Sequence, residues 1–473
     1  MAQNHFDIVV IGSGPGGYIA GLKAAQMGAR AMVIEDHHLG GTCLNYGCIP
    51  SKALLSSAEV LHTIRHAGNW GIQVQGEVQC DWKQVIGHKD RILRQLRGGI
   101  AALFKGRGVV QGEGRGSVES AGRVVVTPKE GSPQVVTGDK VIIATGSVPS
   151  TIPGWPEDPA RICTSDEAVH WTSLPERLLI VGGGVIGSEF ACMMQAFGVQ
   201  VTVVEMLSRL IPTMDADLGD ALGKIFKQRG IDCHLETRID SVQITDQGTI
   251  QARFSGGETR EFDRVLVATG RRPNTKGLGL DQAGIRTDDR GFVPVNDHLE
   301  TNLRGHYAIG DVNGRCLLAH AASAHAAAAV ENALEHGKPF KSPIPSAVYT
   351  FPEVAAVGLT EQQAREKGLP IAIGNFPIGR LGKAMAARHT EGFVKLIRHR
   401  ETGELLGAHM IGAHATECIA AATGMLHLKA SMHDVAEAVW AHPTISEAIK
   451  ESAEDALNMG LHLPPRKIFR VAV

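Results

Sequence analysis

Two cysteines, Cys43 and Cys48, lie five positions apart in the Gly-rich segment 40–52, and cysteine pairs at such short spacing can carry redox chemistry. An undistorted helix separates residues i and i+5 by about 7.5 Å of rise, whereas the Cα atoms of a disulfide lie roughly 4.4–6.8 Å apart. Gly47 and Pro50 offer irregular backbone that would close this gap. A helix that begins near Pro50 would place its positive end beside the thiols and favour thiolates.

The cysteine pair has three interpretations. A reactive disulfide/dithiol couple would close a very short loop and constrain the unfolded chain little, unlike a structural disulfide. Two buried cysteines would act as small hydrophobes, and the spacing alone favours this interpretation. A zinc site would need two more ligands, and no second Cys pair or nearby Cys/His cluster supplies them, so we predict no metal site. The rest of the chain decides between the first two.

A Gly-x-Gly-x-x-Gly turn follows the apolar run 6–11, and a helical stretch and a second apolar run come after it. Gly12 permits the tight turn, Gly14 lets the backbone approach a pyrophosphate, and Gly17 allows close helix–strand packing. The pyrophosphate would lie at the helix N-terminus. Glu35 ends the second run, where its carboxylate can accept hydrogen bonds from both ribose hydroxyls. Strand, turn, helix, strand and terminal acid together predict a dinucleotide site.

The same pattern recurs after the apolar run 178–181. The interval from the first glycine to the acid is twenty-three positions in both copies, and an Ala-Thr-Gly tripeptide follows an apolar run twice, at 144–146 and 268–270. The sequence therefore predicts two dinucleotide folds. The corresponding residues of the second copy are Gly182, Gly184, Gly187 and Glu205.

Two dinucleotide folds together with a reactive cysteine pair imply a relay of electrons. A nicotinamide hydride does not readily reduce a disulfide, whereas a flavin can accept the hydride on one face and exchange electrons with a thiolate on the other. We therefore expect one fold to hold a flavin nucleotide and the other a nicotinamide nucleotide.

Composition and charge exclude several other classes of protein. The chain has 473 residues and a formal net charge of −2, which gives no reason to expect nucleic acid or an anionic membrane as partner. Its 56 glycines suit an α/β protein with tight turns, and eight cysteines in such a length do not make a secreted disulfide scaffold. The first strand begins too early for a signal peptide, and no apolar run approaches the roughly 20 residues of a membrane span. We expect a cytoplasmic protein.

A later strand, 306–311, ends in Gly-Asp and precedes an Ala-rich helix over about 319–334. Asp311 at this strand end could hold the polyol chain of a cofactor or cap a helix, and both alternatives stay open. From residue 346 the pattern changes to an antiparallel hairpin, 394–397 with 405–411, and to amphipathic helices over about 415–430 and 434–439. An α+β module of this kind often serves assembly.

The predicted fold class is α/β, with two Rossmann-like dinucleotide-binding domains and a C-terminal α+β dimerisation domain. The predicted boundaries are 1–150 for the first part of the FAD-binding domain, 151–272 for the NAD-binding domain, 273–345 for the second part of the FAD-binding domain, and 346–473 for the interface domain.

Over essentially its whole length the chain resembles the pyridine-nucleotide disulfide oxidoreductases. Within them it is most similar to the branch that oxidises dihydrolipoamide with FAD and NAD⁺, the E3 components of 2-oxoacid dehydrogenase or glycine cleavage complexes. The segments that carry the resemblance are 40–52, the two glycine turns, 310–311, 318–320, 349–353 and 441–447. Two positions depart from the family pattern: Ser323-Ala324-His325-Ala326 replaces a segment with a Glu-Gly pair, and Phe351 replaces a His.

The resemblance implies a role for each site residue. Cys43 would exchange with the substrate, Cys48 would lie against the flavin, and Lys52 would form an ion pair with Glu189 beside it. The implied FAD-binding residues are Gly12, Gly14, Gly17, Glu35, Lys52, Thr145, Gly146, Asp311 and Ala319. The implied NAD-binding residues are Gly182, Gly184, Gly187, Glu189, Glu205 and Gly270.

By the same resemblance, His442 would be the acid/base, oriented by Glu447 and contributed by the second subunit of a homodimer. Substrate thiols have high pKa values, so a base must take a proton before a thiolate can attack the disulfide. Glu447 would stabilise the resulting imidazolium. Residues 444–447 also read as a capping box, and the two roles of Glu447 can coexist.

Charge decides the expected nucleotide. Glu205 would accept from a ribose 2′-OH and repel a 2′-phosphate, which favours NAD over NADP although Arg209 lies nearby. Two alternatives remain beside the leading interpretation. A related reductase would act on glutathione, trypanothione or mercuric ion, but the C-terminus lacks the Cys pair that mercuric reductases use. The second alternative is a protein that serves only to assemble a complex, since E3 subunits dock on an acyltransferase (E2) core.

Overall fold

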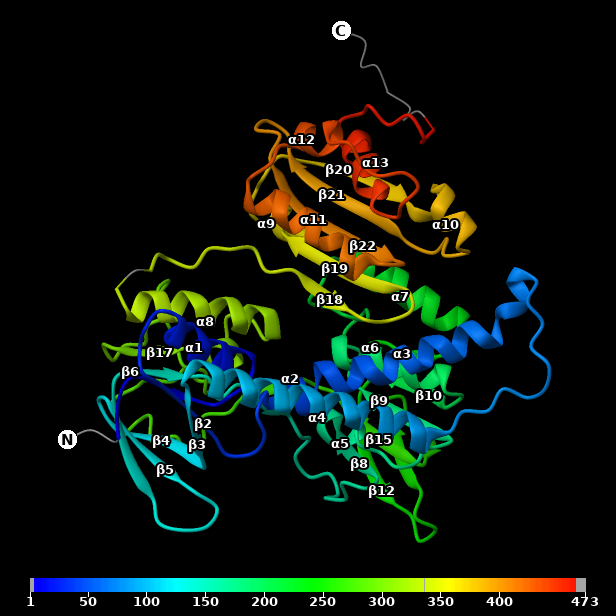
Figure 1. Cartoon of the computed structure of the whole chain (residues 1–473). Helices are drawn as coiled ribbons and strands as arrows, with labels where there is room; N and C mark the ends of the chain where they lie inside the picture. Colours follow the sequence, from blue (N-terminus) through cyan, green and yellow to red (C-terminus); the bar gives the residue numbers. More distant parts are fainter. Residues whose placement is uncertain (1–3, 336, 465–473) are drawn as a thin grey trace. The chain divides into compact units, whose positions relative to one another are not determined.

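The computed structural model describes residues 4–335 and 337–464. The chain divides into two compact units, Met1–Leu174 with Leu266–Lys341, and Pro175–Val265 with Ser342–Val473 (Figure 1). The chain leaves the first unit after Leu174, returns to it at Leu266, and leaves it again after Lys341.

The main sheet of the first unit has parallel strands at its centre. The spatial order is β3 (Val110–Glu113), β2 (Ala31–Glu35), β1 (His5–Ile11), β6 (Gln134–Ile143), β5 (Arg123–Thr127) and β4 (Arg115–Ser120), and β17 (His306–Ala308) also pairs with β6. β1 is parallel to β2 and to β6. Ile8, Val9 and Val10 are fully buried because helices cover one face and further chain covers the other. The apolar run at the start of the sequence is thus the central strand.

Helices α1 (Pro15–Gln26) and α8 (Ala319–Ala333) pack against each other on this unit (Figure 1). A Cβ at Gly16 would lie 3.3 Å from the carbonyl oxygen of Ala322, which shows how closely the two helices approach. The longer pair, α3 (Cys48–Arg65) and α4 (Trp82–Arg107), also packs together. Small residues on α1 and the Ala-rich sequence of α8 permit this close packing.

The second unit repeats the strand–helix–strand order of the first. β9 (Arg177–Val181) leads into α6 (Val185–Ala196), and β10 (Gln200–Val204) returns parallel to β9. β11 (Asp232–His234) pairs with β10 after α7 (Ala216–Gln228). The predicted second dinucleotide fold is confirmed.

The C-terminal part of this unit is a five-stranded antiparallel sheet with helices packed on it. The order is β18 (Ser346–Val348), β19 (Glu353–Gly358), β22 (Leu405–Gly412), β21 (Phe393–His399) and β20 (Ile371–Pro377). β21 and β22 form the predicted hairpin. α11 (Ala415–His427), α12 (Met432–Glu437) and α13 (Glu447–Ala456) share one apolar core with the sheet. The change of character that the sequence shows after residue 346 is a change of sheet type.

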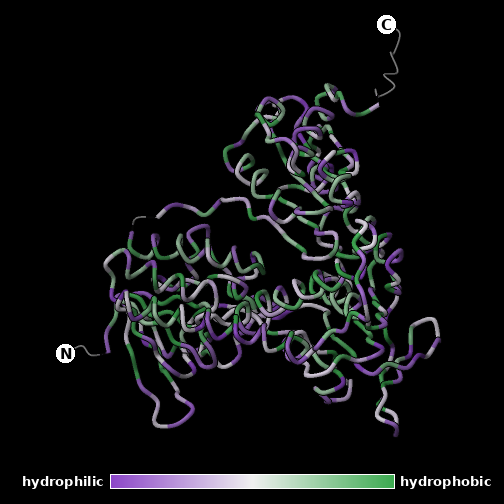
Figure 2. The backbone as a smooth tube through the Cα atoms, turned by 45° about the vertical axis from the view of Figure 1, so that its right-hand side comes forward, coloured by the Kyte–Doolittle hydropathy of each residue, from purple (hydrophilic) through white to green (hydrophobic). Residues whose placement is uncertain are grey.

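Shorter elements complete the described chain: α2 (Gly41–Asn45), η1 (Ala67–Trp70), β7 (Ser147–Pro149), β8 (Ile162–Thr164), α5 (Ser165–Ala168), β12 (Ile239–Ile244), β13 (Ile250–Phe254), β14 (Thr259–Phe262), β15 (Arg264–Val267), β16 (Arg271–Pro273), η2 (Gly310–Asn313), α9 (Glu361–Glu366), η3 (Ile378–Arg380) and α10 (Gly382–Ala386). Figure 2 shows hydrophobic stretches, in green, between hydrophilic ones along the backbone. Within the described residues, no helix is both long and apolar enough to cross a bilayer.

Candidate active site

The cysteine segment folds into two helices separated by a break. Cys43 lies in α2, and α3 begins at Cys48. The backbone turns between them at Gly47, where φ is −126° and ψ is −106°. A Cβ at Gly47 would lie 3.3 Å from the carbonyl oxygen of Thr42, so a side chain would crowd this turn. The break brings the two cysteines together, as the spacing required.

The predicted part played by Pro50 is wrong. Pro50 lies inside the first turn of α3, which begins two residues before it, and it does not produce the bend. A proline is tolerated there because the first amide groups of a helix have no intrahelical partner. The positive end of α3 therefore lies at Cys48 itself, which favours negative charge on that sulfur.

The two cysteine side chains interact directly. The hydrogen bond between them raises the pKa of the Cys43 thiol, and burial raises it further, while the charge of Lys52 opposes both. In the reduced pair, Cys43 therefore keeps its proton, and the helix N-terminus favours charge on Cys48. The two cysteines therefore differ in their surroundings; their predicted roles, Cys43 toward the substrate and Cys48 toward the flavin, stay predictions.

The cysteine segment lies against the first glycine turn. The amide of Gly40 donates to the carbonyl of Ser13 at 3.0 Å. A Cβ at Gly41 would lie 2.7 Å from the Cα of Gly14, and Gly41 has a φ of +55°. The contact needs glycine at position 41, and it places the sulfur pair next to the predicted pyrophosphate site.

Both glycine turns have the geometry of a phosphate cradle. A Cβ at Gly17 would lie 1.8 Å from the carbonyl oxygen of Gly12, and one at Gly187 would lie 1.9 Å from that of Gly182. By contrast, a Cβ at Gly14 or at Gly184 would meet nothing within 4 Å. Positions 17 and 187 therefore need glycine for packing. Positions 14 and 184 leave open space at a helix N-terminus, where a pyrophosphate fits.

The terminal acid of each copy is fixed by backbone amides in the same way. Glu35 accepts from the amide of Ser13 at 2.9 Å through one oxygen and from the amide of His37 at 2.9 Å through the other. Glu205 accepts from the amides of Gly183 at 2.7 Å and Leu207 at 2.9 Å.

A carboxylate offers about four acceptor positions, so two remain for ribose hydroxyls on Glu205 and one remains on Glu35, which also accepts from a hydroxyl. The sequence repeat is thus also a repeat of hydrogen bonds. Sequence reasoning missed one partner, the hydroxyl of Ser13, which donates to Glu35 at 2.6 Å.

Asp311 lies in η2 and caps no helix, so the N-cap alternative is wrong. Its carboxylate accepts from the hydroxyl of Ser147 at 2.5 Å. Arg271 in turn donates to that hydroxyl at 2.7 Å and to the Ser147 carbonyl at 2.8 Å. Burial raises the pKa of Asp311, although Ser147 and the charge of Arg271 oppose the change. Ser147 and Arg271 had no motif that could mark them as site residues.

Other predicted FAD-binding residues show unmet polar groups or free space. The hydroxyl of Thr145 is buried and has no hydrogen-bond partner among the described residues. Gly146 has a φ of +68° and open space where a side chain would begin, and Ala319 begins α8. The unpartnered Thr145 hydroxyl, the open space at Gly14 and Gly146, and the N-terminus of α8 fit a large polar cofactor.

In the second unit, Glu189 is 5% exposed and accepts from the amide of Tyr349 at 3.0 Å. Its ion pair with Lys52 stays a prediction, because these residues belong to different units. Gly270, predicted for NAD, has a φ of +128° and accepts from the amide of Ser150 at 3.0 Å.

His442 and Glu447 meet as predicted. The Nδ1 atom of His442 lies 2.8 Å from one carboxylate oxygen of Glu447, and the other oxygen accepts from the amide of Thr444 at 2.7 Å. His442 is 76% exposed and Glu447 only 21%. Only one half of the predicted capping box is formed, the contact of the Glu447 side chain with the Thr444 amide. The Thr444 hydroxyl donates instead to the carbonyl of Ala441 and does not cap α13. Glu447 thus holds both the backbone and the imidazole, and the imidazole faces outward.

The charge on Glu447 is stabilised by these contacts. Burial alone would raise its pKa, but the Thr444 amide and the His442 side chain outweigh burial, and the pKa is lowered. Glu447 therefore stays ionised and orients His442 so that the Nε2 atom can take or give a proton.

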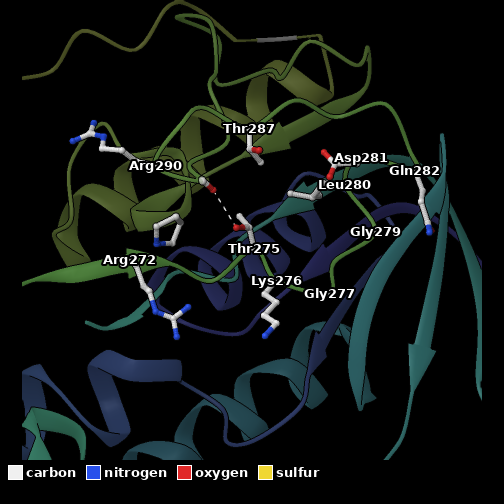
Figure 3. A pocket seen from close by; sticks show the side chains of 12 residues that line it. Arg272, Thr275, Lys276, Gly277, Gly279, Leu280, Asp281, Gln282, Thr287 and Arg290 are labelled. Carbon is white, nitrogen blue, oxygen red and sulfur yellow. Dashed lines mark hydrogen bonds between the residues drawn. The ribbon is translucent and has the colours of Figure 1, made fainter. Parts of the chain in front are cut away.

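A separate pocket of about 440 Å³ lies on the first unit, between residues 272–282 and 287–291 (Figure 3). None of the predicted site residues lines it. Figure 3 shows Arg272 and Lys276 extending in one direction and Arg290 in another, so their charges do not converge on one point. Within the described chain, no group of three or more His, Cys, Asp or Glu is placed to hold a metal ion.

Comparisons with known proteins agree with this geometry. Residues 6–326 match the family described as pyridine nucleotide-disulphide oxidoreductase, and residues 344–453 match its dimerisation domain. The chain is 38% identical over 465 residues to a dihydrolipoyl dehydrogenase from Chlamydia muridarum, covering 98% of this chain and 99% of that protein. It is 40% identical over 464 residues to a mitochondrial dihydrolipoyl dehydrogenase from Pisum sativum, covering 97% and 92%. The crystal structure of LpdA from Mycobacterium tuberculosis matches with a TM-score of 0.89 and 28% identity, covering 95% of this chain and 99% of that one.

The comparisons confirm the predicted resemblance, the α/β fold class with its dimerisation domain, and FAD and NAD as cofactors. The dimerisation domain also supports the predicted homodimer. Since the match runs through both units and agrees with the geometry around the cysteines and the glycine turns, this chain belongs to the pyridine nucleotide-disulphide oxidoreductase family.

Proposed function

We propose that this oxidoreductase converts dihydrolipoamide into lipoamide with NAD⁺, using FAD and a Cys43–Cys48 disulfide. One observation carries the proposal: the two sulfurs interact directly at the start of α3, beside the first glycine turn. A nucleotide held by that turn has a redox-active sulfur pair within the same unit. The names of the relatives from Chlamydia muridarum and Pisum sativum support dihydrolipoamide as the substrate.

Each turnover removes two electrons and two protons from the substrate dithiol. His442 takes a proton from one substrate thiol, and the resulting thiolate attacks the Cys43 sulfur, so that Cys48 leaves as a thiolate. The second substrate thiol then displaces Cys43 and its proton passes to the leaving Cys43 sulfur, which closes the lipoamide disulfide and leaves a Cys43 thiol and a Cys48 thiolate, while His442 holds the first proton. Bound FAD supplies the two-electron route from the cysteine pair to NAD⁺, and NADH and one proton are released.

Glu447 is proposed as a positioning residue for His442. It accepts from His442 and from the Thr444 amide at once, so the imidazole ring is tied to the start of α13. We propose that the outward-facing His442 serves the cysteine pair of the other subunit in a homodimer. Its exposure of 76% in the single chain supports this assignment, because a base that serves its own subunit would lie against its own site.

Purified protein tests the reaction directly. We expect flavin absorbance with a long-wavelength thiolate-to-flavin band on two-electron reduction, and turnover of free dihydrolipoamide with NAD⁺. Cys48→Ser should abolish lipoamide turnover and retain electron transfer from NADH to a dye. Cys418→Ser, a partly buried cysteine in α11, is the matched control and should retain both activities.

A second outcome would favour another substrate. If the purified protein reduces glutathione disulfide or mercuric ion and leaves dihydrolipoamide unchanged, the proposed substrate is wrong. The absence of any thiol–disulfide turnover would favour a pure assembly role. We also propose that the dimer docks on an acyltransferase core and acts in the cytoplasm, and co-sedimentation with lipoyl-bearing acyltransferase would test the docking.

A further inference from the structure

A buried histidine of α8 lies beside the Gly310–Asp311 turn. His325 is 1% exposed, and it stands within the segment that departs from the family pattern. The amide of Gly310 donates to its Nδ1 atom at 3.4 Å. Because Nδ1 accepts a hydrogen bond, the imidazole is neutral and carries its proton on Nε2.

The surroundings hold the imidazole in this position and keep it neutral. The ring meets Phe340 edge to face, with the ring centroids 4.8 Å apart and the planes at 83°. Burial lowers the pKa of His325 to about 4, and the charge of Arg315 acts in the same direction. At neutral pH the Nδ1 lone pair is therefore available to the Gly310 amide.

Gly310 is the hinge of the turn that His325 contacts. Its φ is +70°, and a Cβ there would lie 2.9 Å from the Cβ of Ala322 on α8. The glycine is itself buried, so its amide has no access to water and needs an acceptor. The imidazole provides that acceptor from α8, which ties the turn to the helix.

The next residue in the chain is Asp311. Its carboxylate is fixed on the far side by the Ser147 hydroxyl and, through it, by Arg271. The turn is thus held from two directions, by His325 through the backbone and by Ser147 through the side chain. A shift of Gly310 would move the Asp311 carboxylate directly, because only one peptide unit separates them.

We propose that His325 is a positioning residue for the flavin site, which holds the Gly310–Asp311 turn in the conformation that presents the Asp311 carboxylate to the cofactor. The inference rests on the proposed role of Asp311 toward the ribityl chain of FAD. It assigns a function to a histidine in the segment where this chain departs from its family.

The test compares two substitutions at one position. In His325→Asn, the side-chain oxygen can take the place of Nδ1 as acceptor, whereas His325→Leu fills similar space without an acceptor. The dissociation constant for FAD is measured by titrating apoprotein, with flavin fluorescence as the signal, and the visible absorption and circular dichroism of bound flavin are recorded. We expect His325→Leu to weaken FAD binding about tenfold and to change the flavin spectrum, and His325→Asn to stay close to wild type.

Two further variants make the outcomes distinct. His427→Leu, a histidine at the end of α11, is the matched control and should leave FAD binding unchanged. Asp311→Ala should weaken FAD binding; if it does not, the role of Asp311 fails and the proposal fails with it. If Asp311→Ala weakens binding but His325→Leu does not, or if the Asn and Leu variants lose affinity equally, only the role of His325 is overturned. Lipoamide turnover is not the readout, so these results are separate from the substrate assignment.

Discussion

At the scale of single residues, His442 is the group whose removal should separate the two half-reactions. In the proposed mechanism it takes the proton of the substrate thiol and has no part in electron transfer from NADH to a dye. We expect His442→Asn to lower dihydrolipoamide turnover about 10²–10⁴-fold, the usual contribution of a general base, while NADH-to-dye transfer stays near wild type. His427→Asn is the control; equal loss of both activities in the His442 variant would contradict the assignment.

Glu447 makes a second prediction, about pH and stability. Burial would raise its pKa in the folded chain, but the Thr444 amide and His442 outweigh burial, and the pKa is lowered. A carboxyl with a lowered folded pKa stabilises the fold above its unfolded pKa of about 4.3, and this contribution is lost as pH falls through the folded pKa. Thermal unfolding of wild type and Glu447→Gln should therefore differ at neutral pH and converge in acid. A constant difference across the pH range would contradict this.

Glu205 should set the choice of nucleotide. Two backbone amides fix its carboxylate, and the free acceptor positions suit a ribose 2′-OH and repel a 2′-phosphate. We expect Glu205→Ala to raise the KM for NADH about tenfold or more and to change NADPH use much less. Steady-state kinetics with both nucleotides measure this, and equal losses would refute the role.

These residues show what sequence reasoning can find. Cys43, Glu35 and Glu205 were predicted because a motif fixes their distance from glycines along the chain. Ser147 and His325 were not, since each acts through one hydrogen bond to a residue more than ten positions away. No periodicity or local propensity records such a contact; only the folded backbone brings the partners together.

At the scale of elements, the break between α2 and α3 was half predicted. Gly47 was expected to bend the chain and does so, whereas Pro50 was expected to bend it and lies within α3. A proline in a first helical turn and one that ends a helix look alike in sequence, because both lack the amide proton. The hairpin of β21 and β22 was easier to predict from sequence. Two apolar runs separated by a short turn that contains glycine are typical of an antiparallel hairpin.

A buried charge cluster joins α7 to the C-terminal sheet within the second unit. Lys395 on β21 is 2% exposed at its side chain, and its ammonium lies 2.9 Å from Asp215, 2.7 Å from Asp217 and 2.7 Å from Glu361. Burial alone would lower the pKa of Lys395, but hydrogen bonds to the three carboxylates outweigh it and raise the pKa. Lys395 therefore stays charged at neutral pH.

Removing Lys395 should leave Asp215, which is 1% exposed, as an uncompensated buried charge. We expect Lys395→Met to cost about 3–5 kcal/mol in the free energy of unfolding of this unit, measured by urea titration with NAD-free protein. Lys450→Met is the matched control: its pair with Glu454 is 3.6 Å long on a partly exposed helix face, and its loss should cost less than about 1 kcal/mol. Equal effects of both substitutions would show that the cluster adds no stability.

At the scale of the whole molecule, the internal repeat explains why so much of the architecture was predictable. A strand, a glycine turn, a helix and a second strand recur with the same spacing and with the same amide contacts to the terminal acid. The sequence assigned residues 273–345 to a second part of the FAD-binding domain, and in the structure residues 266–341 join the N-terminal unit after the chain has passed through the other. The predicted boundaries at 150, 272 and 345 remain predictions.

The assembly prediction needs two subunits in one experiment. If the partner's His442 serves each cysteine pair, Cys48→Ser and His442→Asn homodimers are both inactive, but a mixed dimer contains one complete site. Unfolding and refolding the two variants together in equal amounts should restore about a quarter of wild-type turnover, since half of the dimers are mixed and each has one of two sites. Refolding each variant alone is the control and should restore none. If His442 served its own subunit, the mixed dimer would hold no complete site, so failure to recover turnover in dimers shown to be mixed would place the acid/base and the sulfur pair in one chain.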